Sequence, residues 1–185
     1  MIANNNLDHD WIAFKAGDKE AFARIYRQHV NALLKYGCKI HNNRSMIKDC
    51  VQDLFIELWK TRANLSEVTS VKFYLFQSIR YKIFRKVRDE SRVELLTLEN
   101  HDHLSLWHVE NDLVAFEMQS QQMSQLKESI NALPSRQREA INLRFYNNFT
   151  NEEVAQIMGV NYKSACRFIY LAIKKLKINL KVSIS

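Results

Sequence analysis

Apolar residues recur at intervals of three and four positions along much of the chain, which is the pattern of helices with one buried face. The first such segments are 18–40 and 45–60, and each begins with an Asp or a Ser, residue types that commonly cap helices. A third predicted helix begins after the polar loop 61–70 and continues to about Arg88. We assign these three helices to a first domain, 18–92.

The second half of the chain shows the same pattern after an interruption. Residues 93–112 have no helical period and are expected to form an extended linker. Helical character resumes at Leu113, and Pro134 is expected in the first turn of a further helix, where its missing N–H costs nothing. That helix is predicted to reach about Tyr146, and it would bury Ala140, Ile141 and Phe145. The second domain is placed at 113–181.

A helix-turn-helix is predicted from residue 150 onward. Thr150 and Glu153 have the spacing of a capping box, and Gly159 can adopt the left-handed conformation that ends a helix. Asn161 can then cap a second helix, whose exposed N-terminal end is the part that reads base edges in such motifs. We identify as candidate DNA-contacting residues Asn161, Tyr162, Lys163, Ser164, Cys166 and Arg167.

The distribution of charge is uneven. The chain carries a net charge of +7. Residues 72–92 hold seven basic and two acidic side chains, 93–119 hold six acidic and no Lys or Arg, and 160–185 hold six basic and no acidic ones. Two nucleic-acid surfaces joined by an acidic connector would give this order, although chance clustering on solvated faces would also give it. With three glycines and one proline in 185 residues, we predict an all-α fold of two small helical domains joined by an acidic linker.

The predicted third helix combines aromatic and basic residues. Exposed aromatic rings beside cations suit unpaired bases, because every base offers a π-face and its backbone offers negative charge. The alternative is an ordinary core helix, since most aromatic residues at helical spacing are buried. The candidate nucleic-acid contacts on this helix are Tyr74, Arg80, Tyr81, Lys82, Arg85 and Arg88.

Three segments together resemble the extracytoplasmic-function sigma factors of bacterial RNA polymerase. Residues 49–59, Asp-Cys-Val-Gln-Asp-Leu-Phe-Ile-Glu-Leu-Trp, are similar to the family's D-x-V-Q-E-x-F-x-x-x-W helix. Residues 74–88 resemble its promoter-melting helix, and 133–177 resemble its −35-binding domain. The resemblance covers most of 18–178 and implies a dissociable specificity subunit of RNA polymerase rather than an enzyme.

The resemblance also implies roles for individual segments. Gln52, Asp53 and Glu57 would dock on the coiled coil of the polymerase's largest subunit. The loop 61–70 and the helix after it would capture the separated non-template strand at the −10 element. The helix from Asn161 would read the −35 element as duplex, the acidic linker would thread the basic channels of the polymerase, and an anti-sigma factor would be a further partner.

Some residues depart from the family pattern. Arg80 is followed by Tyr81 where the family has an Arg-Asn pair, and Arg85 replaces a frequent Asp. In the second helix of the helix-turn-helix, Cys166 and Phe168 replace residues that are commonly basic. We therefore expect a promoter sequence unlike the family average.

Two other functions fit parts of the sequence. A conventional dimeric helix-turn-helix transcription regulator would bind a palindromic site in free duplex, with an N-terminal half that dimerises or senses a ligand. A helical adaptor with no DNA role would leave the helix-turn-helix and the C-terminal basic block unexplained. The helix 49–59 and the acidic linker favour the sigma factor.

The sequence predicts neither a metal site nor a cofactor. The three cysteines, Cys38, Cys50 and Cys166, are far apart and match no disulfide or CxxC spacing, which indicates a reduced, cytoplasmic chain. Three nearby histidines, His101, His103 and His108, lack matching ligands and are expected to be solvated. No nucleophile motif or phosphate-binding loop is present, so no catalytic residue is assigned. No apolar run is long enough to span a bilayer, and we expect no stable membrane insertion.

Overall fold

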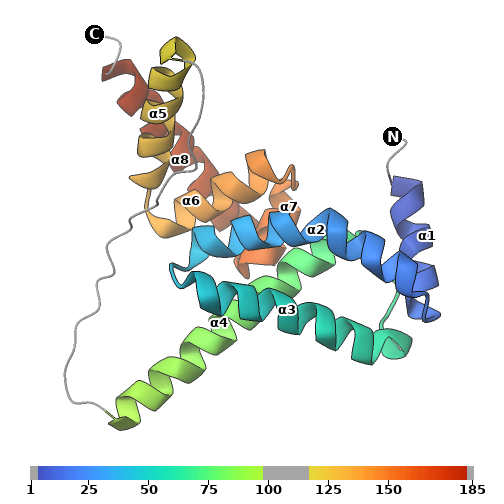
Figure 1. Ribbon diagram of the computed structural model, residues 1–185. Helices are drawn as coiled ribbons and strands as arrows, with labels where there is room; N and C mark the ends of the chain where they lie inside the picture. The colour runs from blue at the N-terminus through green and yellow to red at the C-terminus, as the bar shows by residue number, and fades with distance from the viewer. Residues whose placement is uncertain (1–3, 98–116, 183–185) are drawn as a thin grey trace. The chain divides into compact units, whose positions relative to one another are not determined.

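The computed structural model describes residues 4–97 and 117–182, and within these ranges the secondary structure is entirely helical (Figure 1). The chain divides into two compact units, Met1–Leu98 and Glu99–Ser185, which we call unit 1 and unit 2. The all-α fold class predicted from the sequence is confirmed.

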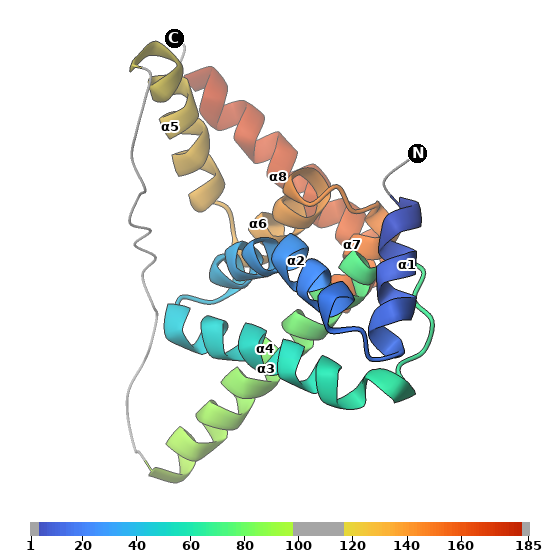
Figure 2. The same ribbon diagram turned by 45° about the vertical axis from the view of Figure 1, so that its right-hand side comes forward.

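Unit 1 is built from α2 and α3, which lie side by side, and from α4, which packs against both (Figures 1 and 2). The side chains that face the interior are large and apolar, among them Leu33, Tyr36, Ile47, Leu75 and Phe76. The described elements of unit 1 are α1 (Asn4–Lys15), α2 (Lys19–Ile40), α3 (Arg44–Thr61), the short 3-10 helix η1 (Arg62–Asn64) and α4 (Val71–Thr97).

Two helices of unit 1 differ from their predicted ends. The cap of α3 is Asn43, whose side chain accepts a hydrogen bond from the N–H of Met46 at 3.0 Å, so the assignment of Ser45 as a cap was wrong. Helix α4 continues to Thr97 instead of ending near Arg88, because the intervening residues include neither Gly nor Pro. The start of the predicted linker is therefore helical, and its remainder, with the three histidines, lies outside the described residues.

Helix α1 was not predicted from the sequence. Trp11 and Phe14 are buried on its inner face, and Asp10 is buried beside them. The ring centroids of these two aromatic residues are 5.2 Å apart, and the Phe14 ring stacks on Phe22 of α2 at 5.3 Å. Helix α1 thus extends an aromatic cluster that also includes residues of α2 and α3.

Unit 2 has a core to which α6, α8 and the turn between α5 and α6 contribute. Leu133, Ile141 and Ala172 are fully buried, and the aliphatic side chains of Ile173 and Leu176 pack against them. The described elements are α5 (Glu117–Asn131), α6 (Ser135–Ile141), the π-helical segment η2 (Asn142–Tyr146), α7 (Asn151–Met158) and α8 (Tyr162–Val182). Pro134 precedes α6 at the N-cap position rather than lying in its first turn.

The π-helical segment overturns one predicted core position. Phe145 was expected to be buried, yet 53% of its surface is exposed, and Leu143 occupies the core instead. In this segment the N–H of Asn147 donates to the carbonyl of Asn142 at 3.1 Å, a spacing of five residues. The additional residue in the turn rotates the following side chains away from the positions that a regular α-helix would give them.

Candidate nucleic-acid interface

Helix α3 presents a polar face to solvent. Gln52, Asp53 and Glu57, the residues assigned to polymerase binding, are all exposed. They are placed there because the opposite face of α3 supplies the core with Ile47, Cys50, Val51, Leu54, Phe55 and Leu58. Burial raises the pKa of the Cys50 thiol, so this cysteine stays protonated within the core.

The outer face of α4 carries the aromatic and basic candidates. Tyr81 is 64% exposed, and Arg85 and Arg88 are also exposed, whereas Tyr74, Arg80 and Lys82 are half-buried. The guanidinium of Arg80 lies 4.4 Å from the ring centroid of Phe84, which is itself exposed. Phe84 therefore adds a second accessible ring to this face.

Ion pairs connect α3 to α4. Lys82 pairs with Glu57, and Lys86 lies 3.8 Å from Asp49. Along α4 itself, Arg85 and Asp89 are 3.8 Å apart at the favourable spacing of four residues. From the sequence, Glu57 was assigned to polymerase binding and Lys82 to nucleic-acid binding. Their ion pair therefore places the two candidate surfaces of unit 1 next to each other.

A groove of about 1110 Å³ runs between α3 and α4. Its walls bring together members of both predicted sets, and apolar side chains form its floor. The candidate residues that line it are Asp53, Glu57, Tyr74, Tyr81, Lys82 and Arg85. The structure thus gathers residues from two segments of the sequence around one open surface of mixed charge.

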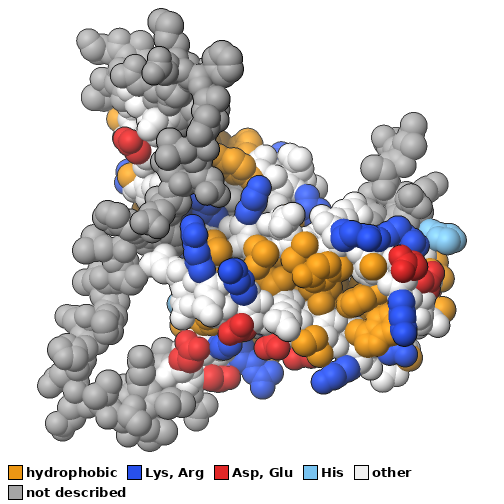
Figure 3. All heavy atoms as spheres, viewed as in Figure 1, with side chains coloured by type: hydrophobic (Ala, Val, Ile, Leu, Met, Phe, Trp, Pro, Cys, Tyr) orange, Lys and Arg blue, Asp and Glu red, His pale blue; other side chains and the backbone are white. Residues whose placement is uncertain are grey.

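A hydrophobic area also lies on the face of unit 1 formed by α2 and α3 (Figure 3). Tyr26 of α2 and Ile56 of α3 are both exposed, and the Tyr26 ring packs edge-on against Phe55 with centroids 4.8 Å apart. Tyr26 follows the helical spacing of the buried residues of α2, but the structure leaves it at the surface.

The helix-turn-helix of unit 2 forms as its sequence predicts. The side chain of Thr150 accepts from the N–H of Glu153 at 3.2 Å, and the Glu153 carboxylate accepts from the N–H of Thr150 at 2.8 Å. Gly159 has φ of +63°, the left-handed conformation that ends α7. Asn161 then accepts a hydrogen bond from the N–H of Ser164 at 2.8 Å and caps α8.

The N-terminal end of α8 exposes most of its candidate residues. Asn161, Tyr162, Lys163 and Arg167 are exposed, whereas Ser164 and Cys166 are half-buried. The amide of Asn151 donates to the Cys166 sulfur at 3.6 Å, and contact with the same thiol raises the pKa of Tyr162. Cys166 therefore also joins α7 to α8.

Lysines continue the basic surface along α8. Lys174, Lys175 and Lys177, which belong to the C-terminal basic block, are exposed. Lys175 also donates to the carbonyl of Ala132 at 3.3 Å. The basic surface of α8 thus extends well beyond the N-terminal end that carries the candidate DNA contacts.

The described residues include no cluster of His, Cys, Asp or Glu that could hold a metal ion. None of the described helices combines the length and the apolar character needed to cross a membrane.

Two family models match the chain. The model of sigma-70 region 2 matches residues 25–93, and that of sigma-70 region 4 matches residues 123–176. The chain belongs to the sigma-70 family. It is an RNA polymerase sigma factor in which region 2 is followed by region 4, and the resemblance to extracytoplasmic-function sigma factors is confirmed. Because the chain belongs to this family, the alternative function of a conventional dimeric helix-turn-helix transcription regulator is rejected.

Solved structures of sigma factors share the fold. The sigma factor RpoE of Bartonella quintana, in complex with the anti-sigma factor NepR, is 22% identical with a TM-score of 0.66, over 87% of this chain and 97% of that one. CnrH, in complex with the cytosolic domain of CnrY, is 19% identical with a TM-score of 0.62, over 95% and 97%. No curated protein sequence matches the chain.

Two features of this sigma factor escaped the sequence analysis. Phe84 was counted as neither core nor contact, although its position three residues after Tyr81 puts both rings on the same side of α4. Helix α1 was not among the predicted helices, the first of which began at residue 18. The three-residue spacing of Trp11 and Phe14 just before Gly17 was the available signal.

Proposed function

We propose that unit 1 of this sigma factor docks on core polymerase through Gln52, Asp53 and Glu57 of α3 and captures the unpaired −10 strand with the loop 61–70 and α4. Unit 2 reads the −35 element as duplex with the N-terminal end of α8. The observation that supports this division is a chemical difference between the two surfaces. The face of α4 combines exposed rings with cations, which suits unstacked bases, whereas the end of α8 presents cations and polar groups from a capped helix, which suits a major groove.

The same proposal covers the setting in which the protein works. It acts as a non-catalytic specificity subunit in the cytoplasm, with core RNA polymerase and promoter DNA as partners. An anti-sigma factor is a further partner, and support comes from the structural neighbours, which were solved as complexes with NepR and with the cytosolic domain of CnrY.

Transcription in vitro tests the overall function. Core polymerase is incubated with this protein and a pool of templates with randomised upstream sequence, and the transcribed templates are sequenced. We expect selection of two short elements at the spacing of −35 and −10, and no selection without the protein. A template pool that is transcribed equally in both reactions would contradict the proposal.

Polymerase docking has its own test. The double variant Gln52→Ala with Asp53→Ala should weaken core binding at least about tenfold. It removes an amide and a carboxylate with which α3 would bind the polymerase. Gln28→Ala, at an exposed position of α2, serves as the control. Unchanged core affinity in the double variant would refute this assignment.

DNA recognition is tested on the selected promoter. Arg167→Ala should weaken binding of the −35 duplex about tenfold, since one good contact to a base edge accounts for roughly 1–3 kcal/mol. Lys127→Ala removes the same charge from α5 and should have little effect. Tyr81→Ala should weaken binding of the unpaired −10 strand by a similar factor, whereas Tyr170→Ala, equally exposed on α8, should not.

A further inference from the structure

Helix α1 lies outside the residues matched by the region 2 model, which begin at residue 25. It nevertheless contacts three parts of unit 1, namely α2, η1 and α4. Trp11 is 3% exposed and Phe14 is fully buried, so the helix is anchored by large apolar side chains. Its contacts with η1 and α4 are made where the loop 61–70 begins and ends.

Trp11 contacts both the loop and the helix that follows it. Its indole N–H donates to the carbonyl of Ser66, in the middle of the loop, at 3.4 Å. The same ring lies edge-on to Tyr74, one turn into α4, with centroids 5.5 Å apart. One buried side chain therefore sets the distance between the loop backbone and a candidate base-contacting residue.

The start of the loop is also in contact with α1 and with the corner between α1 and α2. Arg62 donates to the carbonyl of Trp59 at 2.6 Å, and its guanidinium lies 4.4 Å from the Trp59 ring centroid. Phe14 reaches this ring, with centroids 6.3 Å apart, and a Cβ at Gly17 would lie 3.7 Å from Nε of Arg62. The corner between α1 and α2 thus packs beside the first residues of the loop.

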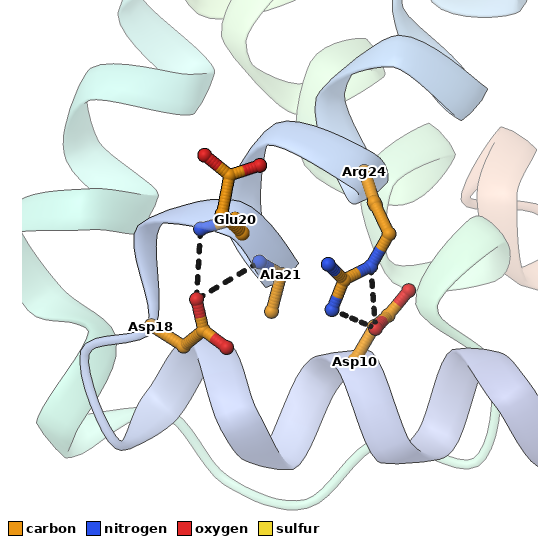
Figure 4. A network of polar contacts seen from close by, with 5 residues as sticks. All are labelled: Asp10, Asp18, Glu20, Ala21 and Arg24. Atoms are coloured by element: carbon orange, nitrogen blue, oxygen red, sulfur yellow. Dashed lines mark hydrogen bonds and ion pairs between the residues drawn. The ribbon is translucent and has the colours of Figure 1, made fainter.

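Helix α1 is itself fixed in orientation. Both Nε and Nη2 of Arg24 donate to one carboxylate oxygen of Asp10, at 3.0 and 2.7 Å (Figure 4). Asp10 is 7% exposed, and burial from water strengthens such a pair. At the other end of the corner, Asp18 accepts from the N–H groups of Glu20 and Ala21 and caps α2 (Figure 4).

We propose that α1 is a positioning element for strand capture, in which Trp11 holds the loop 61–70 and Tyr74 in the geometry that receives the unpaired −10 strand. This inference rests on the proposed function, because it requires that the loop and α4 bind that strand. The loop is short and largely exposed, with Ala63, Asn64, Ser66, Glu67 and Thr69 all at the surface. Packing from α1 lowers the entropy that such a loop loses when it binds.

The test measures strand binding and polymerase binding separately. Holoenzyme is assembled from core polymerase and the full-length protein, and it is titrated with the selected promoter carrying an unpaired −10 segment. Trp11→Leu should weaken binding of this premelted promoter about tenfold, as expected when a binding loop loses its preorganisation. Trp11→Phe, which keeps a ring but lacks the N–H, should weaken it about threefold.

Core affinity and −35 duplex binding should stay within about twofold in both variants, which separates positioning from a general loss of fold. Ile12→Ala, at an exposed position of the same helix, is the matched control and should change neither property. Trp11→Phe decides the question if Trp11→Leu fails to fold.

The outcomes distinguish this inference from the function on which it rests. If Tyr81→Ala weakens binding of the premelted promoter and folded Trp11 variants do not, α1 is not a positioning element although strand capture stands. A parallel loss of core affinity and strand binding would also overturn the inference, because α1 would then be a general support of unit 1. If Tyr81→Ala has no effect, the capture assignment itself fails.

Discussion

Unit 1 and unit 2 place their candidate surfaces by different means. In unit 2 the start of α7 and the start of α8 are set mainly by hydrogen bonds between residues three positions apart, in the capping box of α7 and the Asn161 cap. In unit 1 the candidate surface for strand capture depends on pairs far apart in the chain, such as Trp11 with Ser66 and Glu57 with Lys82. Unit 1 should therefore be sensitive to changes in packing, and unit 2 to changes in local backbone conformation.

The largest effect is expected where Gly37 of α2 packs against Ile47 of α3. A Cβ at Gly37 of α2 would lie 2.5 Å from Cγ2 of Ile47 on α3. Gly37→Val should lower the free energy of unfolding of unit 1 by at least about 3 kcal/mol, because the branched side chain must push α2 and α3 apart. Denaturant unfolding followed by hydrogen exchange of peptides from each unit measures this loss.

Asn31→Val provides the matched control for this substitution. It introduces the same β-branched residue at an exposed position of α2 and should cost only about 0.5 kcal/mol. Equal losses from the two variants would show that the close approach of α2 and α3 does not limit the stability of unit 1.

A second effect expected only in unit 1 is a loss of folding stability at acidic pH. His29 is 4% exposed, and burial lowers its pKa to about 4, with a smaller contribution from the positive charge of Lys72. Its pKa in the unfolded chain is about 6.5, so the unfolded chain binds the proton more readily. The stability that the neutral imidazole provides is complete above pH 6.5 and is lost as the pH falls from 6.5 towards 4, by about 2–3 kcal/mol.

Unit 2 contains no histidine between residues 117 and 182, so it should lack this dependence. Hydrogen exchange at pH 7 and pH 5 should show weakened protection of α2 and α3 with little change in α7 and α8. His29→Gln should remove most of the difference in unit 1 between the two pH values. A slope that persists in this variant would assign the acid sensitivity to other groups.

The same contrast explains what the sequence could predict. The turn of the helix-turn-helix followed from residue types, because Thr150, Gly159 and Asn161 each act on their own neighbours. The cap of α3 was misassigned because several residues that can cap a helix, Asn42, Asn43 and Ser45, lie close together before it. Phe145 was misplaced since periodicity assumes 3.6 residues per turn and η2 does not follow it.

The fold class and most helices could therefore be predicted, whereas the packing of α1 against the loop 61–70 could not. Trp11 and Ser66 are separated by 55 residues, and no local pattern indicates that they meet. The groove between α3 and α4 is a similar case, because it depends on how two helices cross. What the sequence predicted were the faces of helices, and what it lacked were the contacts between them.

In unit 2 the first local change to test is at the turn. Gly159→Ala should lower the free energy of unfolding of unit 2 by about 1–2 kcal/mol, because alanine in the left-handed conformation brings its Cβ against the following carbonyl. Gln156→Ala, on the exposed face of α7, is the control and should be nearly neutral. A loss that appeared in unit 1 instead would contradict the division between the units.

The smallest effect is expected from the loss of a single hydrogen bond at the start of α7, and two substitutions of Thr150 distinguish this loss from a change in side-chain shape. Thr150→Ala removes the oxygen that accepts from the N–H of Glu153 and should cost unit 2 about 1 kcal/mol. Thr150→Ser keeps that oxygen and should retain most of the stability, so the two variants differ in the cap and little else. If serine and alanine gave the same thermal stability, the capping box would not be what defines the start of α7, and the view that unit 2 is specified by local contacts would lose its strongest support.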